Sequence, residues 1–256
     1  MDTLVGLLFG RLSAMGRFGL PDGIRACLFD LDGVLTRTAS VHRAAWGEVF
    51  DPLLASHGQP AFTDEDYLRF VDGKPRRDGV RDFLAARGID VAEGSPGDSP
   101  DADTVAGIGN RKNVLLLKRL EEDGVEVFPG SVTYLRTVHG SGIGTAVVTS
   151  SANGAEVIRA AGIEDLVEQR VDGLVADQEG LPGKPEPDTF VEAARRLGVE
   201  PSEAAVFEDA QAGIAAGRAG GFGFVVGVDR GDQAEALRAS GADVVVNDLA
   251  DLLGVS

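Results

Sequence analysis

Two aspartates separated by a single residue follow the first buried strand that the sequence predicts. Asp30 and Asp32 come directly after the apolar run 26–29, and Gly33 then allows the backbone to turn sharply or to approach a ligand closely. Carboxylates at the end of a buried strand are costly unless a cation or a proton compensates their charge. Alone, the pattern Asp-Leu-Asp-Gly fits an ordinary turn equally well, so its interpretation depends on the rest of the chain.

Three other places in the chain carry polar residues that complement these acids. They are the end of the predicted strand 143–148, a short loop further on, and the end of the predicted strand 204–207. In chain order, the residues there are Thr149, Ser150, Ser151 and Asn153, then Lys184 between Gly183 and Pro185, then Glu208 and Asp209. Ligands of open parallel sheets bind beyond the carboxyl ends of the strands, and neighbouring strands are about 4.8 Å apart. We therefore expect these residues to meet the two aspartates around one small volume.

Phosphoryl transfer is the chemistry that this set of residues favours. Clustered carboxylates are hard oxygen ligands that suit Mg²⁺, and hydroxyls with free N–H groups at a helix start suit a phosphate. An aspartate beside a metal and a lysine can attack phosphorus as a nucleophile. Each piece alone has an ordinary explanation, since hydroxyls and acids cap helices and Lys-Pro is common in loops. Their joint presence at these strand and loop ends makes coincidence the poorer explanation.

Alternating helices and strands after residue 125 predict an α/β fold, a doubly wound and mostly parallel sheet with helices on both faces. The predicted strands are 26–29, 143–148, 171–176, 204–207, 224–228 and 244–246. The predicted helices of this part are 131–138, 155–161, 188–197, 210–219 and 233–240. Asp188 is expected to cap the third of these helices, and Gly198 to end it.

Between residues 40 and 120, apolar residues recur at helical spacing and β-branched runs are scarce. The predicted helices here are 41–54, 65–71, 79–86 and 114–120, with a polar loop at 93–103. We therefore expect a four-helix cap, residues 38–121, inserted into a core formed by residues 23–37 and 122–256. Residues 1–22 are predicted to be an N-terminal extension, either loose or a helix packed on the body.

Composition narrows the classes of partner. The chain has 41 acids against 24 bases, a net charge of -17, which argues against nucleic acid or an anionic membrane as a partner. Because Cys27 is the only cysteine, an intrachain disulfide and a multi-cysteine zinc site are excluded. The apolar segment 4–9 is too short to cross a membrane and lacks the basic start of a secretory signal. We expect a cytoplasmic protein, a monomer with a dimer as the alternative, acting on a small molecule.

These motifs resemble those of the haloacid dehalogenase superfamily over nearly the whole chain. Segment 30–36 resembles the first motif, Thr149 the second, Lys184 the third and segment 208–209 the fourth. The resemblance implies a Mg²⁺-dependent mechanism through a covalent aspartyl-phosphate.

The resemblance also implies a role for each motif residue. Asp30 would attack phosphorus, and Asp32 would serve as the general acid/base. Thr149 and Lys184 would hold the transferring phosphoryl group. The implied Mg²⁺ ligands are Asp30, the backbone carbonyl of Asp32, and Asp209, with Glu208 in support.

Within that superfamily, the cap is similar to that of the β-phosphoglucomutase family. A threonine, a histidine and a tryptophan stand at the family's spacings, segment 72–79 resembles its cap loop, and segment 111–113 resembles its Arg-Lys-Asn element. The resemblance implies that Lys112 pairs with His42 and controls the general acid/base. The residues implied to bind the substrate, a sugar phosphate, are Thr38, Trp46, Arg76, Asn113, Ser150, Ser151 and Asn153, with Arg76 gripping the phosphate that is not transferred.

Three functions stay open at this point. The first is a mutase that interconverts β-glucose 1-phosphate and glucose 6-phosphate. The second is a phosphatase acting on a small sugar phosphate, because Ala152 stands where mutases commonly carry a lysine for the distal phosphate. The third is a binding module that kept the fold, which the complete set of reactive motif residues argues against. Arg37, where the family commonly has an acid, and the long segment 93–109 also depart from the family pattern.

Overall fold

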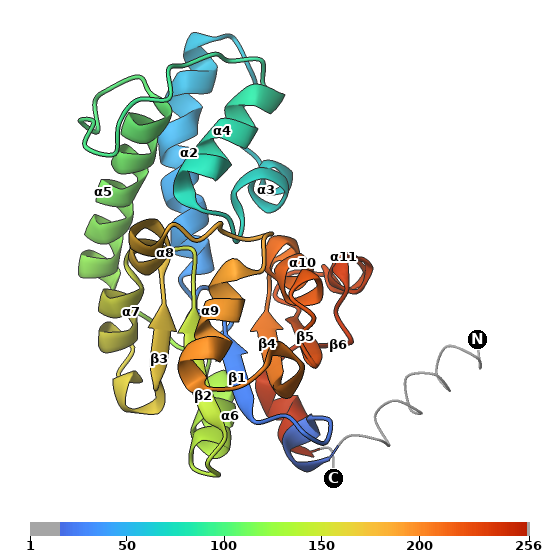
Figure 1. The fold of residues 1–256 in the computed structure, drawn as a ribbon. Helices are drawn as coiled ribbons and strands as arrows, with labels where there is room; N and C mark the ends of the chain where they lie inside the picture. The colour runs from blue at the N-terminus through green and yellow to red at the C-terminus, as the bar shows by residue number, and fades with distance from the viewer. Residues whose placement is uncertain (1–15, 255–256) are drawn as a thin grey trace, which may run out of the picture.

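The computed structural model describes residues 16–254, in which a sheet body lies below a group of helices (Figure 1). The sheet has six parallel strands in the order β3-β2-β1-β4-β5-β6. The strands are β1 Ala26–Phe29, β2 Gly144–Val148, β3 Gln169–Val171, β4 Ala204–Glu208, β5 Phe224–Val228 and β6 Val244–Val246. This order confirms the predicted doubly wound sheet, and its switch point, where ligands of such folds bind, lies between β1 and β4.

Helices cover both faces of this sheet. They are α6 Pro129–His139, α7 Gly154–Ala160, α8 Gly173–Glu179, α9 Asp188–Leu197, α10 Gln211–Ala219 and α11 Ala234–Ser240, with short 3₁₀ turns at Arg17–Gly19, Glu164–Leu166, Pro201–Glu203 and Leu249–Gly254. On β1, Cys27 and Phe29 pack in one apolar cluster with Tyr134 of α6, whereas Leu28 packs in a second cluster with Phe190 of α9. Burial on both faces explains why the strands are continuous apolar runs in the sequence.

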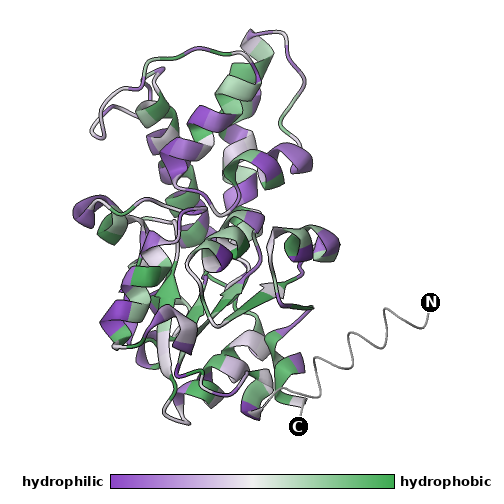
Figure 2. Cartoon of the chain, turned by 45° about the vertical axis from the view of Figure 1, so that its right-hand side comes forward, coloured by the Kyte–Doolittle hydropathy of each residue, from purple (hydrophilic) through white to green (hydrophobic). Residues whose placement is uncertain are grey.

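The chain between β1 and α6 forms the helical group above the carboxyl ends of the strands (Figure 1). Its elements are α2 Ala39–Ser56, α3 Asp64–Asp66, a π-helical turn Tyr67–Val71, α4 Arg76–Ala86 and α5 Val105–Asp123. Phe50 is fully buried there, with its ring 5.1 Å from that of Trp46 and 4.3 Å from that of Phe83. All members of this third apolar cluster come from residues 46–115, so these helices pack around a core of their own. Figure 2 shows hydrophobic residues concentrated in the strands and alternating with hydrophilic ones along the helices.

The prediction of a strand at residues 171–176 is wrong. β3 ends at Val171, and α8 begins after Asp172, whose carboxylate accepts a hydrogen bond from the Val175 N–H at 3.0 Å. The apolar residues of this segment fit either element by spacing alone. The aspartate cap, which satisfies an unpaired N–H of the first turn, favours the helix.

Two other boundaries differ from the predictions. α5 begins well before the predicted 114–120, at Val105, and the hydroxyl of the preceding Thr104 caps it by accepting a hydrogen bond from the Gly107 N–H at 2.9 Å. Gly107 resembles a helix breaker in the sequence, but a Cβ there would lie 2.4 Å from the Ala102 carbonyl oxygen, so close packing explains the glycine. Asp188 lies inside α9 and makes no capping hydrogen bond, since Pro187 holds the cap position. The remaining predicted elements are present, with ends that differ by a few residues.

The prediction for residues 1–22 falls largely outside the described residues, which start at residue 16. Within residues 16–254, no helix is both long enough and apolar enough to span a membrane. The cytoplasmic location and the oligomeric state stay predictions.

Replacing Phe207 tests the packing between β1 and β4. Phe207 is fully buried, and its ring stacks on that of Phe29 with the centroids 4.6 Å apart. Phe207→Ala should lower the free energy of unfolding by about 3–5 kcal/mol, because burial is lost and a cavity remains. Urea unfolding measures this change. The control Val191→Ala, at a side chain that is 38% exposed on α9, should change it by less than about 0.5 kcal/mol; equal effects would contradict the assigned core.

Candidate active site

The Lys184 ammonium lies between two carboxylates at the carboxyl ends of β1 and β4. Its Nζ donates hydrogen bonds to Asp30 Oδ1 and to Glu208 Oε1, both at 2.6 Å, and to the Val148 carbonyl at 3.1 Å. β1 and β4 are neighbours in parallel register, which is why the acids that end them meet. Burial opposes the charge on Lys184, but the two carboxylates outweigh it and raise the pKa of this lysine. Lys184 is therefore a permanently charged group inside the site.

Three buried carboxylates form a group whose ligand atoms lie within 4.8 Å of one another, those of Asp30, Glu208 and Asp209. Burial raises the pKa of Asp30 and that of Asp209 well above the usual range. One lysine ammonium cannot neutralise three carboxylates, so the ionised group needs a further cation. The carboxylate oxygens are hard donors of the kind that divalent ions prefer. This group could therefore hold a metal ion.

Gly33 lets the loop after β1 pass directly beside that group. Its φ of 105° lies in the left-handed region, and a Cβ there would stand 1.8 Å from Asp209 Oδ2. Any side chain at this position would displace the Asp209 carboxylate. Arg230 connects the same loop to the segment after β6. Its Nε donates a hydrogen bond to the Gly33 carbonyl at 2.8 Å, and its Nη1 donates one to the Asn247 carbonyl at 2.7 Å. Arg230 was not among the site residues predicted from the sequence.

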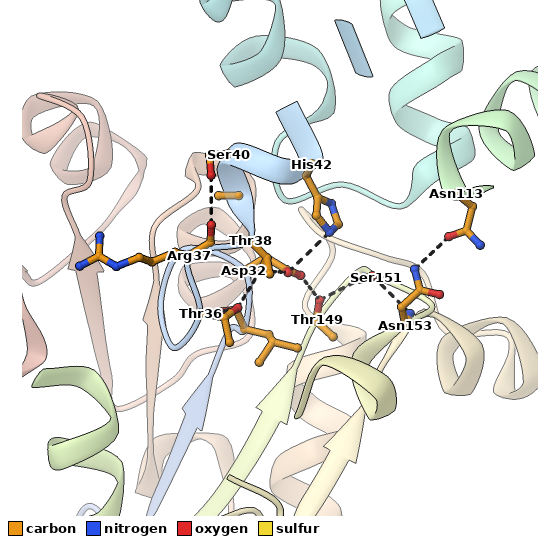
Figure 3. Close-up of polar contacts among 12 residues, drawn as sticks. Asp32, Thr36, Arg37, Thr38, Ser40, His42, Asn113, Thr149, Ser151 and Asn153 are labelled. Carbon is orange, nitrogen blue, oxygen red and sulfur yellow. Dashed lines mark hydrogen bonds and ion pairs between the residues drawn. The ribbon is translucent and has the colours of Figure 1, made fainter. Parts of the chain in front are cut away.

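The Asp32 carboxylate faces hydroxyl groups and the cap instead of joining the three-carboxylate group (Figure 3). The Thr38 hydroxyl donates a hydrogen bond to Asp32 Oδ1, and Thr149 Oγ1 donates one to Oδ2 at 3.1 Å. His42 Nε2, from α2, lies 3.5 Å from Oδ1. The two acids of the Asp-Leu-Asp pair thus have different surroundings. A metal contact through the backbone carbonyl of Asp32 stays a prediction.

His42 is oriented by a lysine from another cap helix. Lys112 Nζ on α5 lies 3.0 Å from His42 Nδ1. When Lys112 is charged it can only donate, so Nδ1 then accepts and the imidazole proton resides on Nε2, the atom that faces Asp32. That Nε2 is buried, and at 3.5 Å from Asp32 it does not meet hydrogen-bond geometry. Lys112 Nζ also lies 5.2 Å from the centre of the Trp46 ring, within the range of a cation–π contact.

The pKa values of this pair follow from their burial. Burial, and then the charge of Lys112, lowers the pKa of His42 to about 4. Burial lowers the pKa of Lys112 to about 7. At neutral pH His42 is therefore a neutral imidazole whose N–H points toward the Asp32 carboxylate.

A cavity of about 300 Å³ lies between the cap and the sheet, a volume typical of small-ligand pockets. Arg76, at the start of α4, lines it with a buried Nε that has no hydrogen-bond partner, while its Nη2 lies 3.4 Å from Asn110 Oδ1. A buried guanidinium with an unpaired N–H suits an anionic group. Asn113 Oδ1 on α5 accepts a hydrogen bond from Asn153 Nδ2 at 2.9 Å, which joins the cap to the loop after β2 (Figure 3).

The two serines after β2 have different contacts. Ser150 Oγ donates to the carbonyl of Gly73 in the cap loop at 2.8 Å. Ser151 Oγ accepts from the Asn153 N–H at 3.3 Å, and the Ser151 N–H donates to Thr149 Oγ1 at 3.1 Å. Ser150 therefore joins cap and core, whereas Ser151 shapes the turn that leads into α7.

The structure brings the predicted site residues together in this one region. Those that line the cavity are Asp30, Asp32, His42, Trp46, Arg76, Lys112, Asn113, Thr149, Ser150, Ser151 and Asp209. The other predicted site residues do not line the cavity but hydrogen-bond to a residue that does; they are Thr38, Asn153, Lys184 and Glu208.

The lining residues that the sequence analysis missed include Tyr67, Asp72 and Asp177. Burial, and then the charge of Glu208, raises the pKa of Asp72 to about 7. Asp177 lies on α8, and its charge acts on Arg76. The available signal for Asp72 was its place before Gly73 in the cap loop, but spacing alone does not say which end of the cavity a loop residue faces.

The comparisons with known proteins agree with this architecture. A family model described as haloacid dehalogenase-like hydrolase matches residues 24–221. The chain therefore belongs to the haloacid dehalogenase-like hydrolases. Within them it belongs to the β-phosphoglucomutase-like family, as its motifs indicated.

Individual relatives point to the same family. The chain is 53% identical over 245 residues to a β-phosphoglucomutase of Mycobacterium tuberculosis. The aligned region covers 92% of this chain and 94% of that protein. It is 31% identical over 237 residues to validoxylamine A 7′-phosphate phosphatase of Streptomyces hygroscopicus, which covers 89% and 95%. A solved β-phosphoglucomutase of Clostridium difficile is 25% identical with a TM-score of 0.72, covering 90% of this chain and 93% of that one.

The low pKa of Lys112 predicts a pH-dependent stability. Between its folded pKa of about 7 and its usual value of 10.5, the unfolded chain binds a proton that the folded chain lacks. Stability should therefore rise with pH in this window, by about 1.4 kcal/mol per pH unit at most. From pH 7 to about pH 9, wild type should gain about 2 kcal/mol relative to Lys112→Met, measured by urea unfolding.

The matched control is Lys118→Met, at a lysine of the same helix whose side chain is 67% exposed. Its stability should follow that of wild type across the same pH range. A Lys112→Met variant that also follows wild type would contradict the assigned pKa.

Proposed function

We propose that the protein is a Mg²⁺-dependent sugar-phosphate mutase that interconverts β-glucose 1-phosphate and glucose 6-phosphate through a phosphoryl group carried on Asp30. The observation that carries this proposal is the link from Lys112 through His42 to Asp32, with separations of 3.0 and 3.5 Å. A mutase must let a sugar hydroxyl, but not water, take the phosphoryl group. This selectivity arises if proton transfer by Asp32 depends on His42 and Lys112 of the cap. The three groups are in contact only when the cap is closed.

The proposed reaction has two half-reactions. In the first, a carboxylate oxygen of Asp30 bonds to phosphorus while the bond from phosphorus to the sugar oxygen breaks, and Asp32 gives its proton to that oxygen. In the second, Asp32 takes the proton from the other sugar hydroxyl, whose oxygen bonds to phosphorus as the bond to Asp30 breaks. Thr149 and Ser150 would orient the phosphoryl group, and the Lys184 charge would offset its negative charge.

The metal that we propose is Mg²⁺, which would neutralise negative charge on the phosphoryl group when bound. The residues that would hold it are Asp30, Asp209 and the backbone carbonyl of Asp32, with Glu208 in support. The support for this assignment is the excess of three buried carboxylates over the single ammonium of Lys184.

A second anion site at the other end of the cavity would let a sugar bisphosphate bind in either of two orientations. The unpaired Nε of Arg76 supports this assignment. The other residues proposed to bind the substrate there are Asn113, Ser151 and Asn153, with Thr38 and Trp46 nearer the acid/base. We also propose residues 38–121 as a cap that moves relative to a core of residues 23–37 and 122–256.

A phosphatase acting on a small sugar phosphate is the second candidate. It is favoured by Ala152, which lines the cavity without adding a cation for the distal phosphate. One relative, at 31% identity, is named validoxylamine A 7′-phosphate phosphatase. Both candidates use Asp30 and the metal, and they differ in the group that receives the phosphoryl.

A product assay separates the two candidates. Incubation with β-glucose 1-phosphate, Mg²⁺ and a sugar bisphosphate activator should yield glucose 6-phosphate as the main product, measured together with free phosphate. Asp30→Asn should abolish turnover, because it removes the nucleophile. His42→Ala should lower mutase turnover by about 10²–10⁴-fold, the usual contribution of general acid/base catalysis.

His57→Ala, at an exposed histidine that follows α2, serves as the control and should leave turnover unchanged. Free phosphate as the dominant product would reject the mutase and favour the phosphatase. No turnover of β-glucose 1-phosphate or of any sugar phosphate in a panel would reject both.

A further inference from the structure

The cap loop between the π-helical turn and α4 rests on the core segments that carry the metal-site residues. Gly73 has a φ of 68°, and a Cβ there would lie 2.8 Å from Cβ of Ala210, the residue after Asp209. Pro75 packs on Gly183, the residue before Lys184, so closely that a Cβ on Gly183 would lie 2.1 Å from Pro75 Cγ. Both contacts bring the loop against the carboxylate end of the cavity.

Asp72, the first residue of this loop, faces the same end. It lines the cavity, and the charges that act on its carboxylate are those of Glu208, Lys184 and Asp32. In turn, Asp72 is the foremost charge acting on Asp209. The charges that act on Arg76, at the anion end, are different ones. Asp72 thus belongs to the metal end of the cavity and not to the distal-phosphate end.

When the cap loop lies against the core, Asp72 adds a negative charge to a region that already has an excess of negative charge. The core supplies three carboxylates and one ammonium there. Asp72 makes four carboxylates against that ammonium, and its side chain interacts with the Tyr67 hydroxyl, which is neutral. Unless a further cation or protons compensate these charges, the seated loop is therefore opposed by like-charge repulsion in a buried site.

We propose that Asp72 is a positioning residue that couples closure of the cap loop to occupancy of the metal site. With a divalent ion bound, the Asp72 carboxylate is attracted to the site and accepts hydrogen bonds from water molecules of the ion, as outer partners of metal sites commonly do. Without the ion, the same carboxylate repels the loop from the core. The inference rests on the proposed metal-dependent function and adds a cap residue that senses the metal.

Hydrogen exchange of residues 71–75 and calorimetric titration with Mg²⁺ test this coupling in the absence of substrate. In wild type, Mg²⁺ should slow exchange of the loop several-fold. In Asp72→Asn, the loop should exchange equally with and without Mg²⁺, and Mg²⁺ should bind about 10-fold more weakly. Asp72→Glu keeps the charge and should retain the Mg²⁺-dependent protection. The control Asp64→Asn removes an equal charge from a cap residue that is 70% exposed and paired with Arg43, and it should behave as wild type.

Two results would overturn the inference. One is an Asp72→Asn variant with wild-type Mg²⁺ affinity and wild-type Mg²⁺-dependent protection. The other is a variant changed only in its KM for sugar phosphate, which would make Asp72 a sugar contact. Because the hydrogen-exchange and calorimetric measurements use no substrate, their failure is distinguishable from failure of the mutase assignment, which the product assay decides.

Discussion

The contact between Lys184 and two buried carboxylates is the constraint on which the rest of the site depends. The Lys184 Nζ lies 2.6 Å from both Asp30 and Glu208, and all three side chains are buried. The parallel register of β1 and β4 brings the acids together, and the lysine reduces the repulsion between them. One positive charge leaves the group of Asp30, Glu208 and Asp209 with an excess of negative charge. This excess suits a divalent ion, and in the proposed reaction that ion would offset the charge of the phosphoryl group.

In the proposed reaction, the cap selects the group that accepts the phosphoryl, which the metal site alone would not do. Thr38 and Thr149 donate hydrogen bonds to the Asp32 carboxylate. His42, on α2, faces Asp32 with one ring nitrogen and contacts Lys112 with the other. These groups come from the first helix and the last helix of the cap as well as from two strand ends. In the proposed reaction, a change in cap position would therefore alter the surroundings of Asp32, the acid/base, without moving Asp30, the nucleophile. The core carries out phosphoryl transfer in this proposal, and the position of the cap controls when the acid/base can act.

Much of the fold and of the site could be predicted because both depend on local patterns. Apolar runs ending in polar residues marked the strands, and parallel order placed Asp30, Thr149 and Glu208 at one edge. The spacing of apolar residues at 171–176 fits a strand as well as a helix. Residues 173–176 form the start of α8 because Asp172 caps that helix. Spacing also could not assign Asp72, because the end of the cavity that a cap-loop residue faces depends on how cap and core pack, which no local pattern contains.

Detection of a phosphoryl group on Asp30 tests the central claim most directly. The enzyme would be mixed with a glucose bisphosphate and Mg²⁺, quenched, reduced with borohydride, which converts an acyl phosphate of aspartate to homoserine, and mapped by peptide mass spectrometry. The account predicts the modification at Asp30, at no other acid, and only when Mg²⁺ is present. Absence of a covalent intermediate under turnover conditions, or its appearance at Asp32 or Asp209, would contradict the account.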